Sequence, residues 1–266
     1  MRLRILFQLD REVLLPMNHQ YQLSGMLYGM LKTSSPEFAK FLHDEGYHLE
    51  DDSFRRFKLF TFSGLRIPAD RRRAEGDHLR VRPGCIEWLV SSPREDFLVH
   101  SATGLLSAGH ELALGAVPLR ITEVSALPEP PFVSPMRFTC LTPIVVSKRL
   151  PDGRAHYLRP LEGEAFSEAV RCNLLRKYAL LHEEAAPADE SFRLEFDARY
   201  LADERHRGGT KKITVKQGID VIGALCPFVV SGSAALIGVG YRTGFGEKNS
   251  LGFGMAEVST GNSGKG

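Results

Sequence analysis

The stretch "LPEPPFVSP", residues 127–135, places four prolines in nine residues near the middle of a 266-residue chain. Proline fixes φ and has no backbone N–H, so this stretch cannot continue a helix or a central strand. Such a segment is typical of a stiff connection between two folded parts. We therefore expect an N-terminal domain at 1–126, a linker at 127–135, a C-terminal domain at 136–260 and a flexible tail at 261–266.

Upstream of the linker, the pattern predicts the order strand, helix, strand, strand, helix, strand. Residues 2–9, "RLRILFQL", are expected to form a buried strand. Asn18 is expected to cap a helix with apolar residues at i, i+3, i+4, i+7 and i+8. A second helical segment should begin at Ser35, carry Pro36 in its first turn and stop at Gly46. The remaining expectations are a strand at 56–65, a hairpin at 79–92 turning at Pro83-Gly84, a helix at 92–109 capped by Ser92, and a strand near 111–124.

Downstream of the linker, the same order of elements recurs without obvious sequence identity. We expect a strand at 136–147, a long amphipathic helix at 163–184, strands at 191–199 and within 210–230, a short helix in "GSAALIGVG" and a last strand at 251–258. The β-α-β-β-α-β order is that of the ferredoxin-like unit. The sequence therefore predicts an α+β protein of two tandem ferredoxin-like domains with a cleft between the two lobes.

The composition excludes several classes of protein. Formal charge is only +2, so a polyanion must be held by a local basic surface and not by a global field. The four cysteines lie far apart with no CxxC pair, which argues against a zinc ribbon or a disulfide framework. The N-terminus is charged and no run is long and apolar enough to span a membrane. We expect a cytoplasmic protein with no membrane partner.

The segment "GVGYRTGFGEKNSLGFGMAEV", 238–258, raises the question of what approaches its glycine-rich backbone so closely. Gly244-Phe245-Gly246 and Gly252-Phe253-Gly254 form two clasps five residues apart, and neither a Walker A loop nor a Rossmann fingerprint fits the spacing. Two interpretations remain open. The backbone amides, with Arg242 and Lys248 nearby, could follow an RNA phosphate chain, or the loop could pack tightly within the protein.

As a pattern, these clasps resemble the C-terminal signature of the repeat-associated RNA-binding superfamily of CRISPR proteins. "GFGEKNSLGFG" is similar to the loop of its repeat-processing endoribonuclease, CRISPR-associated protein six, and "NHQYQLSGMLY", "FLHDEG" and "FKLFTFS" are similar to that family in the same order. The resemblance implies two ferredoxin-like lobes and an endoribonuclease that cuts CRISPR precursor RNA within each repeat. It also implies 2′-hydroxyl attack without metal or other cofactor, leaving 2′,3′-cyclic phosphate and 5′-hydroxyl ends.

Three residues carry the chemistry in this interpretation. Considered alone, Tyr28 lies beside the apolar stripe of its helix and would be an edge-packing tyrosine. His43, near a helix end, would be a partner of the helix dipole, and Lys58, on a strand, would be a solvated lysine. The resemblance implies that all three are catalytic. In the family the tyrosine is usually written as the base and the histidine as the acid. A phenol with a pKa of ~10 is a poor base, so the reverse assignment stays open, while Lys58 is expected to stabilise the phosphorane. About ten residues, "YHLEDDSFRR", appear as an insertion, so His48 is an alternative to His43.

The RNA-binding surface is expected at the glycine loop and on one strand. Lys212 and Lys216 alternate along a predicted strand and therefore share a face. The expected RNA contacts are Arg242, Gly244, Gly246, Lys248, Gly252, Gly254, Lys212 and Lys216. The expected partners are CRISPR repeat RNA and subunits of a CRISPR interference complex, with the protein a monomer or a homodimer. The alternative function is a non-catalytic RNA-binding subunit of such a complex.

Overall fold

The computed structural model describes residues 1–266 except 51, 110, 183, 185–190, 217 and 260–266, and leaves the side chains at 53 and 216 undescribed. Its contacts divide the chain into two compact units. Unit 1 comprises Met1–Glu129 with two short later segments, Thr214–Gly218 and Ser250–Gly252. Unit 2 comprises Pro130–Ile213, Ile219–Asn249 and the residues from Phe253 onward.

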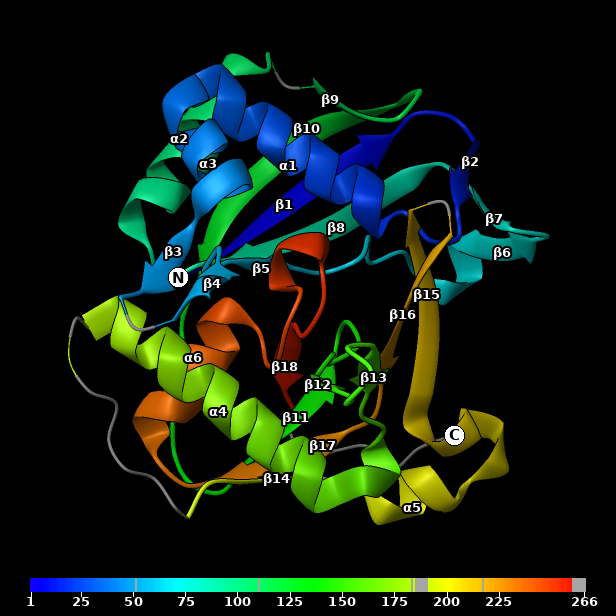
Figure 1. The fold of residues 1–266 in the computed structure, drawn as a ribbon. Coiled ribbons are helices and arrows are strands. Elements are labelled where there is room, and N and C mark those ends of the chain that lie inside the picture. The colour runs from blue at the N-terminus through cyan, green and yellow to red at the C-terminus, as the bar shows by residue number, and fades with distance from the viewer. Residues whose placement is uncertain (51, 110, 183, 185–190, 217, 260–266) are drawn as a thin grey trace. The chain divides into compact units, whose positions relative to one another are not determined.

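Unit 1 is built on a five-stranded antiparallel sheet of order β5-β8-β1-β10-β9. Its strands are β1 (Arg2–Leu9), β5 (Thr61–Phe62), β8 (Gly84–Ser91), β9 (Glu111–Leu114) and β10 (Val117–Leu127). Helices α1 (Gln20–Ser34) and α3 (Glu95–Ser107) pack against each other, and Figure 1 shows α1 lying across β1 and β8. The odd-numbered residues of β1 and the apolar stripe of α1 are buried in one core. This is the ferredoxin-like strand order with β9 added at one edge.

Several predicted features of unit 1 are confirmed. The strand at 2–9 and the helix with its apolar stripe form as expected, and Ser35 caps α2 (Pro36–Lys40) by accepting a hydrogen bond from the Phe38 amide. Beyond α2, a single π-helical turn, η1 (Phe41–Glu45), ends at Gly46, where φ is 67°. That turn places His43 at the end of the helical segment.

Two predicted helix caps are wrong. Residue His19, not Asn18, precedes α1, and its ring does not cap the helix: Nδ1 contacts Pro16 O at 3.0 Å and Nε2 accepts from the Leu65 amide. Helix α3 starts at Glu95, so Ser92 lies outside it. The Ser92 hydroxyl instead donates to Leu59 O at 2.9 Å, a contact 33 residues back in the chain. In the second case a tertiary hydrogen bond takes the side chain that local sequence assigns to the cap.

The predicted hairpin at 79–92 is also wrong, because its two strands belong to different sheets. Strand β7 (His78–Val81) pairs with β2 (Val13–Pro16) and β6 (Arg72–Glu75), whereas β8 pairs with β1 and β5. Gly84 has a φ of 135°, a conformation that lets the chain change direction between the two sheets. A short 3₁₀ turn, η2 (Ala69–Arg71), leads into β6.

The expected strand at 56–65 is broken in two. The first part, β4 (Asp52–Phe57), forms a hairpin with β3 (Tyr47–Leu49), so the segment "YHLEDDSFRR" belongs to this hairpin. The second part is β5. Between them Leu59 adopts a φ of 56°, which a strand does not tolerate. The expected strand near 111–124 likewise consists of two strands, β9 and β10, joined through Gly115.

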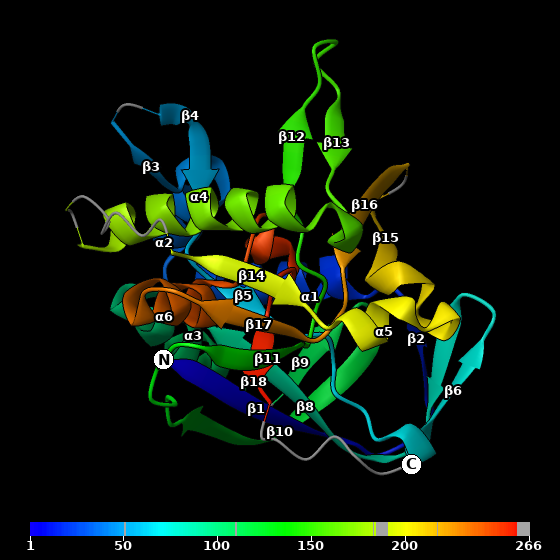
Figure 2. The same ribbon diagram turned by 90° about the horizontal axis from the view of Figure 1, so that it is seen from below.

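Unit 2 repeats the topology of unit 1 with a four-stranded antiparallel sheet of order β14-β17-β11-β18. Its strands are β11 (Met136–Cys140), β14 (Arg193–Phe196), β17 (Phe228–Ser231) and β18 (Ala256–Val258), and its helices are α4 (Gly163–His182) and α6 (Ala234–Thr243). Figure 2 shows α4 running beside β14. The α+β fold class and the two ferredoxin-like units are therefore as predicted.

Short elements are inserted into this second ferredoxin-like frame. Two hairpins interrupt it, β12 (Ser147–Arg149) with β13 (Ala155–Tyr157) and β15 (Thr210–Lys216) with β16 (Ile219–Ala224). The others are α5 (Ala198–Ala202) and the 3₁₀ turns η3 (Pro160–Glu162), η4 (Glu204–Gly209) and η5 (Asn249–Leu251). Within the described part of the chain, no helix combines the length and the apolar character that crossing a membrane requires.

Candidate active site

Tyr28 is held at the edge of the unit 1 core by aromatic packing. It lies on α1 beside the buried stripe, half-buried, with its ring edge-on to Phe60 at 6.1 Å between centroids. On another side its ring meets that of His43, at 5.7 Å and an interplanar angle of 82°. Burial raises the pKa of the Tyr28 hydroxyl to about 12. The phenol is therefore fully protonated at neutral pH.

His43 presents its imidazole to solvent from the π-helical turn, with 74% of the side chain exposed. Its Nδ1–H donates to Asp44 Oδ1 at 2.8 Å. This hydrogen bond, more than the nearby positive charges, lowers the pKa of the Asp44 carboxyl. Because a carboxylate only accepts, it selects the tautomer with hydrogen on Nδ1, which leaves Nε2 with a free lone pair in the neutral ring.

Lys58 follows β4 directly, and its Nζ donates to the His43 carbonyl oxygen at 2.9 Å. The left-handed φ of Leu59 turns the chain here, so Lys58 stays near the surface while Phe60 enters the core. Such a conformation is strained for leucine and is typical of functional sites. Partial burial, followed by the nearby Arg56 charge, lowers the pKa of Lys58, and Asp44 opposes that shift.

Gly46 allows the helix end and Lys58 to approach each other. A Cβ at this position would lie 2.7 Å from Phe57 O and 3.1 Å from Lys58 Nζ. The residue also has a positive φ of 67°. Both conditions require glycine. Gly46 therefore ends the helix and also gives the candidate catalytic lysine, Lys58, room to pack against it.

The structure thus brings the three sequence-predicted catalytic side chains to one place in unit 1. The ring contact joins Tyr28 to His43, and the hydrogen bond joins Lys58 to the same residue. His48 lies on β3, exposed, with its Nδ1–H donating to Leu49 O at 3.3 Å. Tyr28, His43 and Lys58 together provide a protonated phenol, an imidazole with an available nitrogen and an ammonium. Such a set suits proton transfer at a phosphodiester and the stabilisation of added negative charge.

The four glycines of the two clasps are buried, and a Cβ at Gly246, Gly252 or Gly254 would meet protein atoms. A Cβ on Gly246 would overlap the Val145 carbonyl oxygen, and φ there is 76°. The clasps also bind each other, since the Phe245 amide donates to Gly254 O at 2.8 Å. Packing therefore accounts for the glycines at 246, 252 and 254, and a positive φ of 87° accounts for Gly244. Contact of the four glycines with RNA stays a prediction.

Lys177, which sequence reasoning missed, organises this loop from α4. Its side chain is buried, and Nζ donates to Gly244 O at 2.7 Å, Gly246 O at 2.9 Å and Asn249 Oδ1 at 2.7 Å. Burial lowers the pKa of Lys177 to about 7, with Glu247 opposing the shift. The signal was present in the sequence, because Lys177 continues the buried stripe Phe166, Val170 and Leu174 of its helix.

The charged residues predicted to bind RNA lie in different environments. Lys248 is exposed at the tip of the loop with a φ of 58°. The Arg242 guanidinium stacks over the Phe132 ring at 5.1 Å. Lys212 forms an ion pair with Asp220 at 2.6 Å. The side chain of Lys216 lies outside the described residues.

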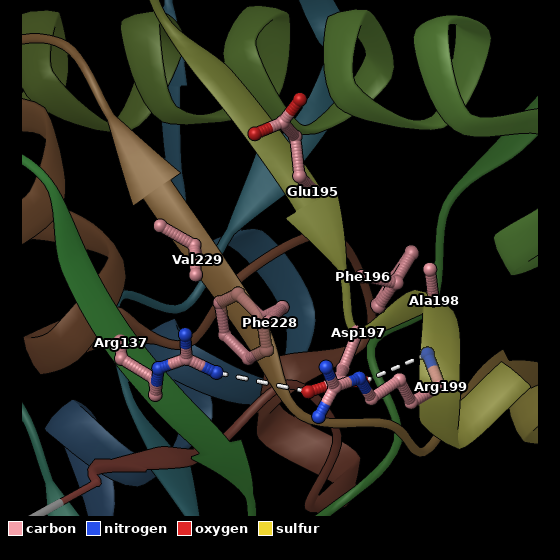
Figure 3. Close-up of a pocket in the computed structure, with 8 residues that line it drawn as sticks. All are labelled: Arg137, Glu195, Phe196, Asp197, Ala198, Arg199, Phe228 and Val229. Carbon is pink, nitrogen blue, oxygen red and sulfur yellow. Dashed lines mark hydrogen bonds and ion pairs between the residues drawn. The ribbon is translucent and has the colours of Figure 1, made fainter. Parts of the chain in front are cut away.

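A cavity of about 490 Å³ opens in unit 2 where β14 ends (Figure 3). The Arg137 guanidinium and the Asp197 carboxylate approach each other in it at 3.7 Å, and Asp197 also accepts from the Arg199 amide. Two of its charged groups, Arg137 and Asp197, thus pair with each other. The lining residues are Arg137, Glu195, Phe196, Asp197, Ala198, Arg199, Phe228 and Val229, which include none of the predicted site residues.

Comparisons with known proteins agree with the fold. Residues 14–125 match the family model described as CRISPR-associated protein Cas6, N-terminal, and residues 127–258 match CRISPR associated protein Cas6, C-terminal. The chain is 31% identical to CRISPR-associated endoribonuclease Cas6 1 of Methanocaldococcus jannaschii, over 96% of this chain and 91% of the relative. It is 30% identical to CRISPR-associated endoribonuclease Cas6 of Pyrococcus furiosus, over 94% and 85%.

A solved structure titled CRISPR associated protein Cas6 superposes with a TM-score of 0.74 at 29% identity, covering 97% of this chain and 99% of that one. The match therefore extends through both units of the chain and is not confined to the glycine clasps. With two relatives at this level of identity along nearly their whole length, the chain belongs to the CRISPR-associated Cas6 family.

Proposed function

We propose that this protein is an endoribonuclease that cleaves CRISPR precursor RNA once within each repeat. The observation that carries the proposal is the convergence of Tyr28, His43 and Lys58 in unit 1 of a Cas6 family member. The reaction is transesterification without a metal ion. The 2′-oxygen attacks the adjacent phosphorus, the bond to the 5′-oxygen breaks, and the products carry a 2′,3′-cyclic phosphate and a 5′-hydroxyl.

The geometry favours one assignment of roles. His43 Nε2 takes the proton of the attacking 2′-hydroxyl, because the Asp44 hydrogen bond holds the other ring nitrogen. Tyr28 donates a proton to the leaving 5′-oxygen, because a phenol with a pKa of about 12 is a proton donor and a poor base at neutral pH. The Lys58 ammonium stabilises the extra negative charge of the pentacoordinate phosphate.

RNA is held by positive charge outside this group of three. Lys248 is the exposed cation of the glycine loop, and we assign it a contact with the phosphate backbone. Arg242 and Lys212 are assigned weaker contacts, because each already has a partner in the protein. We infer that the protein acts in the cytoplasm as a monomer or homodimer and that its product RNA passes to subunits of a CRISPR interference complex.

The first test incubates the purified protein with a repeat RNA in excess chelator. We expect cleavage at one site, with a cyclic phosphate on the upstream product, and no cleavage when a 2′-deoxy nucleotide replaces the residue before the scissile phosphate. RNA that is bound and remains intact would refute the enzyme and leave the non-catalytic RNA-binding subunit. Cleavage of the 2′-deoxy substrate would refute hydroxyl attack.

The second test compares two histidine variants on neighbouring elements. His43→Ala should lower the single-turnover rate by roughly 10²–10⁴-fold, the usual contribution of a general acid or base. His48→Ala is the matched control, because this exposed histidine has no contact with Tyr28 or Lys58 among the described interactions. A reversed result would move the catalytic role to His48.

A further inference from the structure

Phe54 is exposed to an extent unusual for a large apolar side chain. Its side chain is 97% exposed, the largest fraction among the exposed large hydrophobics of the described residues. It lies on β4 in the hairpin that separates His43 from Lys58 in the chain. Single exposed apolar residues are common on protein surfaces, so exposure alone does not define a site. The position of Phe54 relative to the candidate active site is the second observation.

The hairpin that carries Phe54 is anchored at its base. The Tyr47 ring packs edge-on against Phe41 at 5.2 Å, and the Arg94 guanidinium lies over the same ring at 4.9 Å. The pairing between Tyr47↔Phe57 and Leu49↔Asp52 spans two steps on β3 but five on β4, so β4 bulges between these pairs. Bulges redirect side chains and are frequent beside active sites. Phe54 lies within this bulge.

The bulge is tied to the candidate catalytic residues on its far side. The Arg56 guanidinium donates to the Asp44 carbonyl oxygen, next to His43. Lys58 lies two residues beyond Arg56 and donates to His43 O. Four residues of extended chain span at most about 14 Å, so Phe54 lies within that distance of Lys58, measured between Cα atoms. A fully exposed ring thus lies within about 14 Å of the lysine that we expect to contact the scissile phosphate.

The hairpin carries acidic residues, Glu50 and Asp52, as well as basic residues, Arg55 and Arg56. Asp52 is paired with Arg55 at 3.5 Å, and Arg56 has no carboxylate among its described contacts. An unpaired base stacks on an aromatic face, and each such stack contributes about 1–3 kcal/mol to binding. An aliphatic side chain of similar size offers no such face.

We propose that Phe54 is a stacking platform for one unpaired nucleobase of the substrate RNA, close to the scissile phosphate. The proposal rests on the proposed function for the identity of the ligand as RNA. It adds a specificity element, because it requires the nucleotide at that position to be single-stranded when the RNA is bound.

The test measures RNA binding and single-turnover cleavage for Phe54→Ala, Phe54→Trp and Leu106→Ala. Leu106 is the matched control, an 82% exposed apolar residue on α3. Losing one stack should weaken binding of repeat RNA by about 5- to 150-fold for Phe54→Ala, with binding restored in Phe54→Trp and unchanged in Leu106→Ala. At saturating RNA the cleavage rate should change far less than the affinity. Phe54 is solvent-exposed, so these changes should leave the fold intact.

Abasic substitutions along the repeat identify the stacked base. At one position near the cleavage site, removal of the base should weaken binding to the wild-type protein and have no further effect on Phe54→Ala. Equal losses at every position, or unchanged RNA binding by Phe54→Ala, would overturn the proposal. If Phe54→Ala instead abolished only self-association, the ring would be a protein contact and the proposal would again be wrong.

Failure of this inference is distinguishable from failure of the proposed function. A wild-type protein that cleaves in chelator while Phe54→Ala behaves identically would refute the stacking role alone. A wild-type protein that binds without cleaving, but shows the abasic coupling to Phe54, would refute the nuclease and retain the platform.

Discussion

Replacing Lys177 by methionine should change how the stability of the protein depends on pH more than it changes stability at pH 7. Methionine nearly matches the length and shape of the side chain but has no donors. In the wild type, Nζ binds the carbonyls of Gly244 and Gly246 and the side-chain oxygen of Asn249, at 2.7–2.9 Å. The substitution leaves these three acceptors without their donor.

Two terms of similar size oppose each other at neutral pH. An unsatisfied buried acceptor costs about 1–3 kcal/mol, so losing three partners costs roughly 3–9 kcal/mol. The lower end applies, because Gly244 O also accepts from Thr243 Oγ1 at 3.4 Å. Against this, folding lowers the pKa of Lys177 from 10.5 to about 7, and that shift costs about 4 kcal/mol at pH 7, which methionine avoids. We therefore expect a small net change at pH 7.

The pH dependence has a definite sign. Because burial lowers the pKa of Lys177 in the folded state to about 7, the unfolded state binds the proton more tightly between that value and 10.5. Stability contributed by this group therefore rises with pH across that window. The rise should be about 2 kcal/mol between pH 7 and pH 9, and Lys177→Met should lack it.

Urea unfolding of the full-length protein at pH 7, 8 and 9 measures the difference. Lys177→Met should become about 2 kcal/mol less stable relative to wild type as pH rises from 7 to 9. Lys211→Met is the matched control, because Lys211 is exposed, and its difference from wild type should be the same at every pH. A Lys177→Met difference that also stays constant would refute the lowered pKa and the charge-burial argument.

Three further substitutions test the glycine loop and the site. Gly246→Ala should lower the free energy of unfolding by at least about 2 kcal/mol more than Gly76→Ala does. Both glycines have positive φ, but only Gly246 lacks room for a Cβ, and equal urea midpoints for the two variants would contradict this. Tyr28→Phe should lower the single-turnover cleavage rate at least about 10-fold with an unchanged unfolding midpoint, and an unchanged rate would remove the hydroxyl from the mechanism. The positive charge of Arg56 helps to lower the pKa of Lys58, so Arg56→Gln should raise that pKa. The fall in cleavage rate at alkaline pH should then move to higher pH, and a move to lower pH would show that Lys58 is not the cation required.

Sequence patterns predicted the elements well where burial is local and periodic. The stripe of α1 and the strand β1 both place one face in the same core, so periodicity alone identifies them. The hairpin expected at Pro83-Gly84 failed for a different reason. A turn signal shows that the chain reverses but not which sheet each flanking strand joins, and here β7 and β8 join different sheets.

The candidate site was predictable in its members but not in its construction. Tyr28, His43 and Lys58 each suit a structural role when considered singly, and only the family resemblance connected them. No local signal shows that Leu59 turns into the left-handed region. Nor does one show that Gly46 packs against Phe57 and Lys58, because that contact joins residues on either side of the hairpin β3–β4. The length of that hairpin made the histidine assignment ambiguous between His43 and His48.

The glycine clasps and Lys177 explain each other in physical terms. Gly244 and Gly246 both have positive φ, and their carbonyl oxygens are turned toward one point inside unit 2. Three acceptors that converge on a point match the three hydrogens of an ammonium, whereas the planar fork of arginine would direct its donors apart. Arginine is therefore a poorer replacement than its charge suggests. If Lys177→Arg unfolded like the wild type at all pH values, the loop would not require three donors that converge on one point.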